Sequence, residues 1–376
     1  MIFLDYAATS PLDQRVMPIL ERGFCQPQNP SSVHRHGQKA RAALESARET
    51  AAQLLGVARR HVVFTSSATE SNNLVIRGLA ARSQRLHAPL TVLRSDLEHA
   101  CIRETTSRLA TARVLSLQML PVLPTGEVDL ASAPMAPAQL LCLMAVQNET
   151  GVIQPLAEAR AFARDRALLW LCDATQAVGL LDMSHGAVGW DFLTCTSHKL
   201  GGPPGVGLLA GPGLEQLDPV VTGGPQEDER RAGTQPVALI EAFVEALRLA
   251  VEERAARRAH LAALESAFLE RLTELAVPFE RNGAPCLPGF LNIGIAPHTG
   301  VDLVIALDAR RISVSSGSAC ATGVMEPSPA LLAMYPGDED RARRALRLTP
   351  GMGTSTEDMI RVADALAGVA RSKNQG

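Results

Sequence analysis

Lysine is scarce in this chain of 376 residues. It occurs only at Lys39, Lys199 and Lys373, so nearly all of the 36 cationic side chains are arginine. Chemistry that needs a side-chain amine must use one of these three residues, because arginine stays protonated and cannot form an imine. The formal net charge is only −3. It gives no electrostatic reason to expect nucleic acid or an acidic membrane as a partner.

Paired cysteines and long apolar runs are also absent. The seven cysteines are odd in number and never form a C-x-x-C pair, which argues against a disulfide framework or a zinc site and favours a reducing compartment. No uninterrupted apolar run is long enough to span a bilayer, and the opening MIFLDYAATS has no signal-peptide pattern. We therefore expect a cytoplasmic protein with no membrane partner, no nucleic-acid partner and no metal site.

What is present is an alternation of short apolar runs and helical patterns, typical of a parallel α/β sheet. The predicted strands are 61–65, 90–93, 139–146, 167–172, 192–195 and 205–209, and the predicted helices between them are 32–55, 70–81, 102–109 and 156–166. From Val237 to Leu275 a long amphipathic stretch predicts a helix that links two domains. Strand candidates at 290–295 and 311–314 predict a smaller α+β domain after it.

Polar groups follow several predicted strands, at the edge of a parallel sheet where ligands collect. The turn Ser66–Asn72 lies between a strand and a helix. It either binds an anion through free N–H groups and hydroxyls or merely caps the helix. Asp173 ends the apolar run ALLWLC. This carboxylate either caps the next turn or pairs with a protonated nitrogen of a ligand.

Lys199 follows the next predicted strand, beside His198 and before a Gly/Pro turn. An isolated lysine is most often a solvated surface charge, but this chain uses arginine almost everywhere else. A phosphate cradle, a carboxylate for a pyridinium nitrogen and an imine-forming lysine on one α/β sheet together match pyridoxal 5′-phosphate.

Eight segments carry a resemblance to a known family. They are Leu4–Thr9, Asn29–His34, Thr65–Asn72, Glu98–His99, Asn148–Gly151, Asp173–Gln176, Ser197–Lys199 and Ser315–Cys320. In this order they resemble the motifs of the cysteine desulfurases, which are class V aminotransferase-type enzymes that use pyridoxal phosphate. The Ser-Ser-Gly-Ser-Ala-Cys form is similar to that of the nitrogenase and iron–sulfur-assembly subgroup.

The resemblance implies an α/β protein of the fold-type I pyridoxal-phosphate transferase architecture. A large, mostly parallel sheet domain is expected over 16–254. A smaller α+β domain is expected from 1–15 plus 255–376, with the catalytic cysteine loop at about 315–330. The resemblance also implies a homodimer in which Thr234 completes the phosphate site of the partner subunit.

The resemblance further implies a role for each site residue. Lys199 would hold the cofactor and later move protons, while Asp173 would keep the pyridinium nitrogen protonated. Gln176 would donate to the ring's phenolic oxygen, and His99 would stack on the ring and relay protons. The remaining expected cofactor-binding residues are Ala68, Thr69, Asn148, Thr196, His198 and Thr234. Asn148 and Arg347 would also bind the substrate carboxylate.

Cys320 would be the nucleophile that takes sulfur from L-cysteine, leaving alanine and a persulfide. The persulfide would pass to a sulfur-acceptor protein, either a scaffold or a sulfur carrier. The Ser, Gly and Ala residues around Cys320 favour an exposed, movable loop. By contrast, Cys142 and Cys172 lie inside apolar runs, where we expect inert packed thiols.

Two other functions are weighed against the desulfurase. A selenocysteine lyase or another class V aminotransferase would use the same scaffold, but a selenol leaves without a thiol nucleophile, so Cys320 argues against lyase-only chemistry. A non-catalytic sulfur-transfer scaffold would typically lack the lysine or the cysteine, and both are present. The sequence leaves the destination of the sulfur open between iron–sulfur cluster assembly and thiolation pathways.

Overall fold

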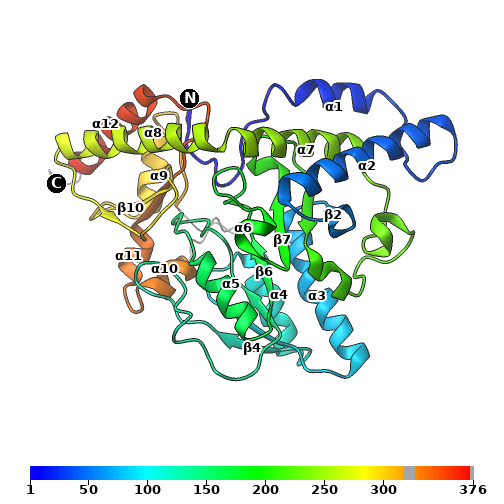
Figure 1. Ribbon diagram of the computed structural model, residues 1–376. Helices are drawn as coiled ribbons and strands as arrows, with labels where there is room; N and C mark the ends of the chain where they lie inside the picture. The colour runs from blue at the N-terminus through cyan, green and yellow to red at the C-terminus, as the bar shows by residue number, and fades with distance from the viewer. Residues whose placement is uncertain (317–326, 373–376) are drawn as a thin grey trace.

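A seven-stranded sheet forms the centre of the molecule (Figure 1). The structure is a computed structural model that describes residues 1–316 and 327–372. The sheet order is β2-β8-β7-β6-β5-β3-β4, and only β8 runs antiparallel to its neighbours. Its strands are β2 Val62–Thr65, β3 Thr91–Arg94, β4 Ser116–Met119, β5 Leu140–Cys142, β6 Leu169–Asp173, β7 Phe192–Thr196 and β8 Gly207–Ala210.

Helices cover both faces of this sheet, so its strands other than the edge strand β4 are apolar on both sides. In β6, Trp170 and Cys172 enter the core on one face, while Leu171 enters the core on the other. The first core includes side chains from α2 (Arg35–Leu55), α5 (Leu156–Asp165) and α7 (Val237–Glu252). The second includes α3 (Ala68–Leu86) and α4 (Ala100–Thr111). This three-layer arrangement confirms the predicted α/β fold.

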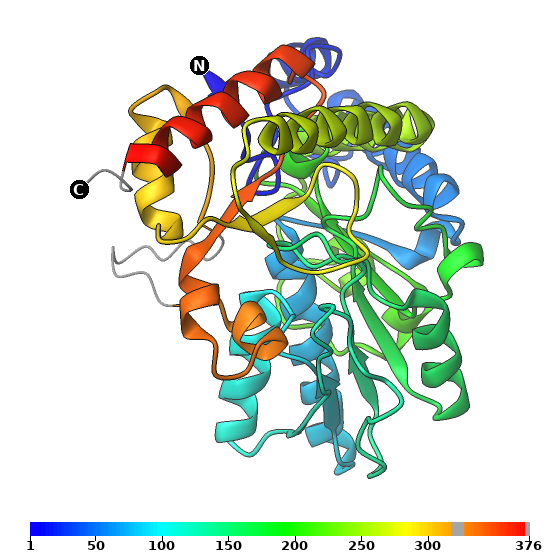
Figure 2. The same ribbon diagram turned by 90° about the vertical axis from the view of Figure 1, so that its left-hand side faces the viewer.

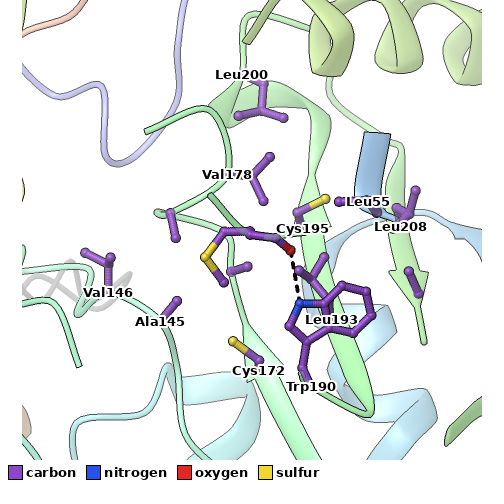
Figure 3. Close-up of a cluster of buried hydrophobic side chains, with 14 of the residues drawn as sticks. Leu55, Ala145, Val146, Cys172, Val178, Trp190, Leu193, Cys195, Leu200 and Leu208 are labelled. Atoms are coloured by element: carbon purple, nitrogen blue, oxygen red, sulfur yellow. Dashed lines mark hydrogen bonds between the residues drawn. The ribbon is translucent and has the colours of Figure 1, made fainter. Parts of the chain in front are cut away.

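Figure 3 shows how completely the thiols of this core are packed. Cys172 and Cys195 lie among apolar side chains, close to the Trp190 indole, whose Nε1 donates to the Met183 carbonyl at 3.0 Å. Cys142 is equally buried, in the core on the opposite face. Burial raises the pKa of both the Cys142 and Cys172 thiols well above the usual range. The prediction that these two cysteines are packed is confirmed.

The linking helix predicted over 237–275 is two helices. α7 ends at Glu252 and α8 spans Arg254–Glu274, because Glu253 leaves helical geometry with φ −88° and ψ 4°. α8 packs along α12 (Thr356–Ser372) (Figure 2). In the described part of the chain, no helix is both long and apolar enough to span a membrane.

A separate core joins the two ends of the chain. Ile2 and Leu4 pack with side chains of α8, α12 and α9 (Gly300–Asp308). The first strand, β1 (Ile2–Phe3), pairs in parallel with β11 (Ile312–Ser313). Beside it, β12 (Ala345–Leu348), β10 (Leu291–Gly294) and β9 (Glu280–Arg281) form an antiparallel sheet. The remaining helices are α1 Met17–Phe24, α6 His185–Val188, α10 Pro329–Met334 and α11 Glu339–Arg344.

Candidate active site

A cavity of about 540 Å³ opens at the carboxyl ends of the parallel strands. It is lined by segments that follow β2, β3, β5, β6 and β7, and by Arg347 of β12. Ten of the predicted site residues line it: Ala68, Thr69, His99, Asn148, Asp173, Gln176, Thr196, His198, Lys199 and Arg347. Segments distant in sequence thus contribute to one site.

Lys199 lies in the short 3₁₀ turn Ser197–Lys199 directly after β7. Its Nζ donates to the carbonyl oxygens of Ala7 and Ala8, the latter at 2.7 Å. Burial, together with the positive charge of Arg347, lowers the pKa of the amine to about 8. A much larger fraction of this amine is therefore neutral at pH 7 than of an ordinary lysine.

Asp173 is the last residue of β6, and only 6% of the residue is exposed. Its Oδ2 accepts from Asn72 Nδ2 at 2.8 Å and its Oδ1 accepts from the Thr175 N–H at 3.0 Å. These two donors hold a buried negative charge in a fixed orientation. Such a carboxylate suits a protonated nitrogen on a bound ring.

His99 is the N-cap residue of α4. Its Nδ1 accepts from the Cys101 N–H at 3.2 Å, so the hydrogen of the neutral ring is on Nε2. Burial lowers the pKa of His99, although Asp173 acts in the opposite direction. The ring is therefore neutral over a wider pH range than a solvated histidine.

The anion side of the cavity is the start of α3. Ser67 caps this helix by accepting from the Glu70 N–H at 3.2 Å, and a helix N-terminus favours negative charge. The turn lies so close to β8 that a Cβ on Gly207 would be 2.8 Å from the Cα of Ser67. Glycine at 207 is thus what allows this approach. Thr69 and Thr196 line the same cavity.

The residues present fit pyridoxal phosphate. The cofactor needs an amine, a carboxylate facing a ring nitrogen and an anion site for its phosphate. Lys199, Asp173 and the N-terminus of α3 supply these three groups around one cavity. Their chemistry, and not the cavity's size, makes the fit specific.

Arg347 lies in β12, a strand of the antiparallel β12-β10-β9 sheet, and it lines the same cavity. Its Nη1 donates to the Asn148 carbonyl at 3.0 Å and its Nη2 to Asp5 Oδ1 at 2.7 Å. Its Nε is buried and has no hydrogen-bond partner among the described residues. Arg347 itself lines the cavity, and its guanidinium suits a small carboxylate.

Gln176 lines the cavity as expected, and its amide Nε2 donates to the Ala7 carbonyl at 3.0 Å. The two remaining predicted site residues are not among the described residues that line the cavity. Thr234 is exposed on the segment before α7 and does not line the cavity. Cys320 lies outside the described residues.

Sequence reasoning assigned no role to four polar residues around this site. Glu98 is buried, its Oε1 accepts from the Met144 N–H at 2.9 Å, and burial raises its pKa to about 8. Burial also raises the pKa of Glu149. Asn72 and Cys101 make hydrogen bonds to the predicted residues Asp173 and His99. Glu98, Glu149 and Asn72 lie within recognisable motifs, but a motif does not tell which neighbour each side chain meets.

Comparison with known families agrees with this site. The family model described as "Aminotransferase class-V" matches residues 2–349. The chain therefore belongs to the class-V aminotransferases, a family whose enzymes depend on pyridoxal phosphate.

Within that family the chain belongs to the cysteine desulfurases. The putative cysteine desulfurase IscS 1 of Bacillus subtilis (strain 168) is 33% identical over 376 residues, which cover 98% of either chain. Among solved structures, a NifS-like protein matches with a TM-score of 0.89 at 27% identity, covering 98% of each chain. The structure of SspA in complex with cysteine matches with a TM-score of 0.79 at 28% identity over 93% of this chain and 99% of that one.

Proposed function

We propose that this protein is a pyridoxal-phosphate-dependent cysteine desulfurase that converts L-cysteine to L-alanine and carries the removed sulfur on Cys320. The observation that carries the proposal is the cavity shared by Lys199, Asp173, His99 and Arg347. The relatives named cysteine desulfurase and the cysteine-bound SspA structure support cysteine as the substrate. When bound, the cofactor supplies an electron sink that stabilises negative charge on the substrate α-carbon.

Lys199 has two tasks in this proposal. Its partly neutral amine holds the cofactor covalently, and the same Nζ then moves a proton to and from the substrate α-carbon. The pKa of about 8 supports both tasks, because a general base works best when its pKa lies near the operating pH. His99, neutral and protonated on Nε2, would pack against the cofactor ring and relay protons.

The remaining residues bind and orient. Asp173 would keep a proton on the ring nitrogen, Gln176 would donate to the phenolic oxygen, and Arg347 with Asn148 would bind the substrate carboxylate. Ala68, Thr69, Thr196 and His198 would bind the phosphate. The hydrogen bond from Arg347 Nη2 to Asp5 helps to fix the orientation of the guanidinium beside the cavity.

Sulfur transfer requires a thiolate at Cys320. The thiolate attacks the sulfur of the substrate, so an S–S bond forms as the carbon–sulfur bond breaks. The electron pair of that bond remains on carbon, which takes up a proton and leaves as alanine. The net change is L-cysteine plus the Cys320 thiol giving L-alanine plus the Cys320 persulfide, with no external oxidant or reductant.

The experiment is a reaction of the pyridoxal-phosphate-loaded protein with L-cysteine, followed by alanine quantification and mass spectrometry of the thiols. The wild type should form alanine and gain one sulfur on Cys320. Cys320→Ser should keep the visible absorbance of the bound cofactor but lose at least about 100-fold in alanine formation. Wild-type turnover of cysteine by that variant would refute the mechanism. Cys25→Ser, at an exposed cysteine away from the cavity, is the matched control.

The protein acts in the cytoplasm as a homodimer, and it passes sulfur to an acceptor protein in iron–sulfur cluster assembly or a thiolation pathway. Residues 16–254 form the cofactor-binding domain, and 1–15 plus 255–376 form the domain that carries Cys320. The shared core of Ile2, Leu4 and the C-terminal helices supports this division.

A further inference from the structure

A chain of hydrogen bonds joins Asp173 to His99 through two residues that have no assigned role. Thr194 Oγ1 bonds to Asn72 Oδ1 at 2.9 Å, and Asn72 Nδ2 bonds to Asp173 Oδ2 at 2.8 Å. The same Nδ2 lies 3.3 Å from Cys101 Sγ, which in turn lies 3.1 Å from His99 Nδ1. The residues come from β7, α3, β6 and the start of α4.

The direction of each bond is fixed by chemistry. The Asp173 carboxylate only accepts, so the Asn72 amide must turn its NH₂ toward it and its oxygen toward the Thr194 hydroxyl. The second amide hydrogen then points to the Cys101 sulfur. His99 Nδ1 accepts from the Cys101 N–H and so has no hydrogen to donate to the sulfur. In the contact between Cys101 Sγ and Nδ1 the S–H is therefore the donor, and it shares the single lone pair of Nδ1 with the N–H.

Cys101 can play this part because it stays a thiol. Burial, followed by the negative charge of Asp173, raises its pKa to about 12. Thr69 also contacts the sulfur. Cys101 is only partly buried and lines the cavity, whereas Cys142 and Cys172 are wholly buried in the apolar cores. Simple packing explains those two cysteines but not the polar partners of Cys101.

We propose that Asn72 and Cys101 are positioning residues that fix the Asp173 carboxylate and hold His99 as the neutral Nε2–H tautomer. Asn72 orients the group that faces the ring nitrogen, and the Cys101 thiol orients the ring that stacks on the cofactor. The importance of this arrangement for turnover rests on the proposed function. The hydrogen bonds themselves do not, so they can be tested in the protein without cofactor.

The effect of the Cys101 thiol can be measured as a change in the pKa of His99. Burial lowers the pKa of His99, Asp173 raises it, and Lys199 and Arg103 lower it further. Donors on Nδ1 stabilise the neutral ring, because a protonated Nδ1 cannot accept. Removing the thiol should therefore raise the pKa of His99. The loss of one hydrogen bond corresponds to roughly half a unit to one unit.

The first experiment is an NMR titration of the cofactor-free protein labelled with ¹⁵N-histidine. Wild type should show His99 as the Nε2–H tautomer, with its pKa below the ordinary value. Cys101→Ala should raise that pKa, and Cys101→Ser should restore most of the shift because a hydroxyl also donates. Cys25→Ala is the matched control and should leave His99 unchanged, since Cys25 is exposed and does not line the cavity.

The second experiment measures the affinity for pyridoxal phosphate from its visible absorbance. Asn72→Ala should weaken binding about 10-fold, because Asp173 loses one of its two donors. An unchanged His99 pKa in Cys101→Ala, a serine variant that behaves like the alanine variant, or full affinity in Asn72→Ala would overturn the proposal. A desulfurase assay that fails while the NMR shifts appear would refute the proposed function and leave the positioning role intact.

Discussion

The amine of Lys199 shows how burial can make one residue reactive. The amine donates to the carbonyls of Ala7 and Ala8. Burial lowers its pKa most and the positive charge of Arg347 lowers it further, whereas Asp5 and Asp173 raise it. The balance gives a larger neutral, nucleophilic fraction of the amine than in a solvated lysine.

This balance predicts the pH dependence of cofactor capture. Only a neutral amine attacks an aldehyde, so the rate at which cofactor-free protein takes up pyridoxal phosphate should rise with pH and level off above about pH 8. The measurement is the initial rate of visible absorbance gain between pH 6.5 and 9.5. Nα-acetyl-lysine is the reference compound, since its free amine titrates near 10.4 and should not level off in that range.

An uptake rate that climbs in parallel with the reference compound would contradict the lowered pKa. Arg347→Met offers a further check at the same residue. Without the guanidinium, the pKa of Lys199 should rise and the plateau should move to higher pH.

A buried ion pair anchors the segment before α7 to α2. Arg48 of α2 donates from Nη1 and Nη2 to the Glu227 carboxylate at 2.6 and 2.8 Å. Glu227 also accepts from the Phe64 N–H at 2.8 Å and the Gln235 amide at 3.2 Å. These bonds anchor a segment in which Glu227, Asp228 and Glu229 all have positive φ, at 52°, 54° and 63°.

The left-handed backbone at Glu229 gives a stability prediction. Glu229 is exposed, and glycine adopts this φ without the Cβ penalty. Glu229→Gly should therefore raise the free energy of unfolding by about 0.5–1 kcal/mol. The measurement is a urea denaturation curve of the cofactor-free protein.

Glu49→Gly is the matched control for this change. It also removes one exposed carboxylate, but from the interior of α2, where glycine costs about 1 kcal/mol. The two variants should thus shift stability in opposite directions. A lower stability in Glu229→Gly would show that the positive φ values impose no strain there.

The sequence predicts the buried elements better than the edges and the contacts. Apolar runs locate β2, β6 and β7 to within a residue or two. The polar edge strand β4 (Ser116–Met119) was not predicted, because its side chains are exposed or half-buried and so show no apolar pattern. The run 139–146 is strand only over Leu140–Cys142, since its later residues leave the sheet to line the cavity.

Contacts across the site were harder to predict, for a physical reason. Asn72 meets Asp173 and Cys101 only because α3 packs against both α4 and β6. The motifs indicate that these residues matter near a cofactor. They do not indicate which donor faces which acceptor, since that depends on how α3 and α4 pack on the sheet.

At the scale of the whole molecule, the proposed dimer makes a prediction about mixed subunits. Thr234 is exposed and does not line the cavity of its own chain, and it is expected to complete the partner's phosphate site. Thr234→Ala and Lys199→Ala proteins should each bind cofactor poorly. Mixing and refolding them together should restore one of the two sites in each mixed dimer. In that site Lys199 comes from the Thr234→Ala subunit and Thr234 comes from the Lys199→Ala subunit.

The measurement is cofactor absorbance and alanine formation after mixing, with each variant refolded alone as the control. If mixing restores nothing while the variants form dimers by light scattering, Thr234 does not act across the interface. Full cofactor affinity in Thr234→Ala alone would contradict its role altogether.

The pairing of Ile2 with Ile312 also has a consequence for biosynthesis. Ile2 finds its strand partner only after residue 312 has been synthesised. Arg347, which lines the cavity and lowers the pKa of Lys199, is translated later still. Cofactor loading should therefore begin only after residue 347 has left the ribosome.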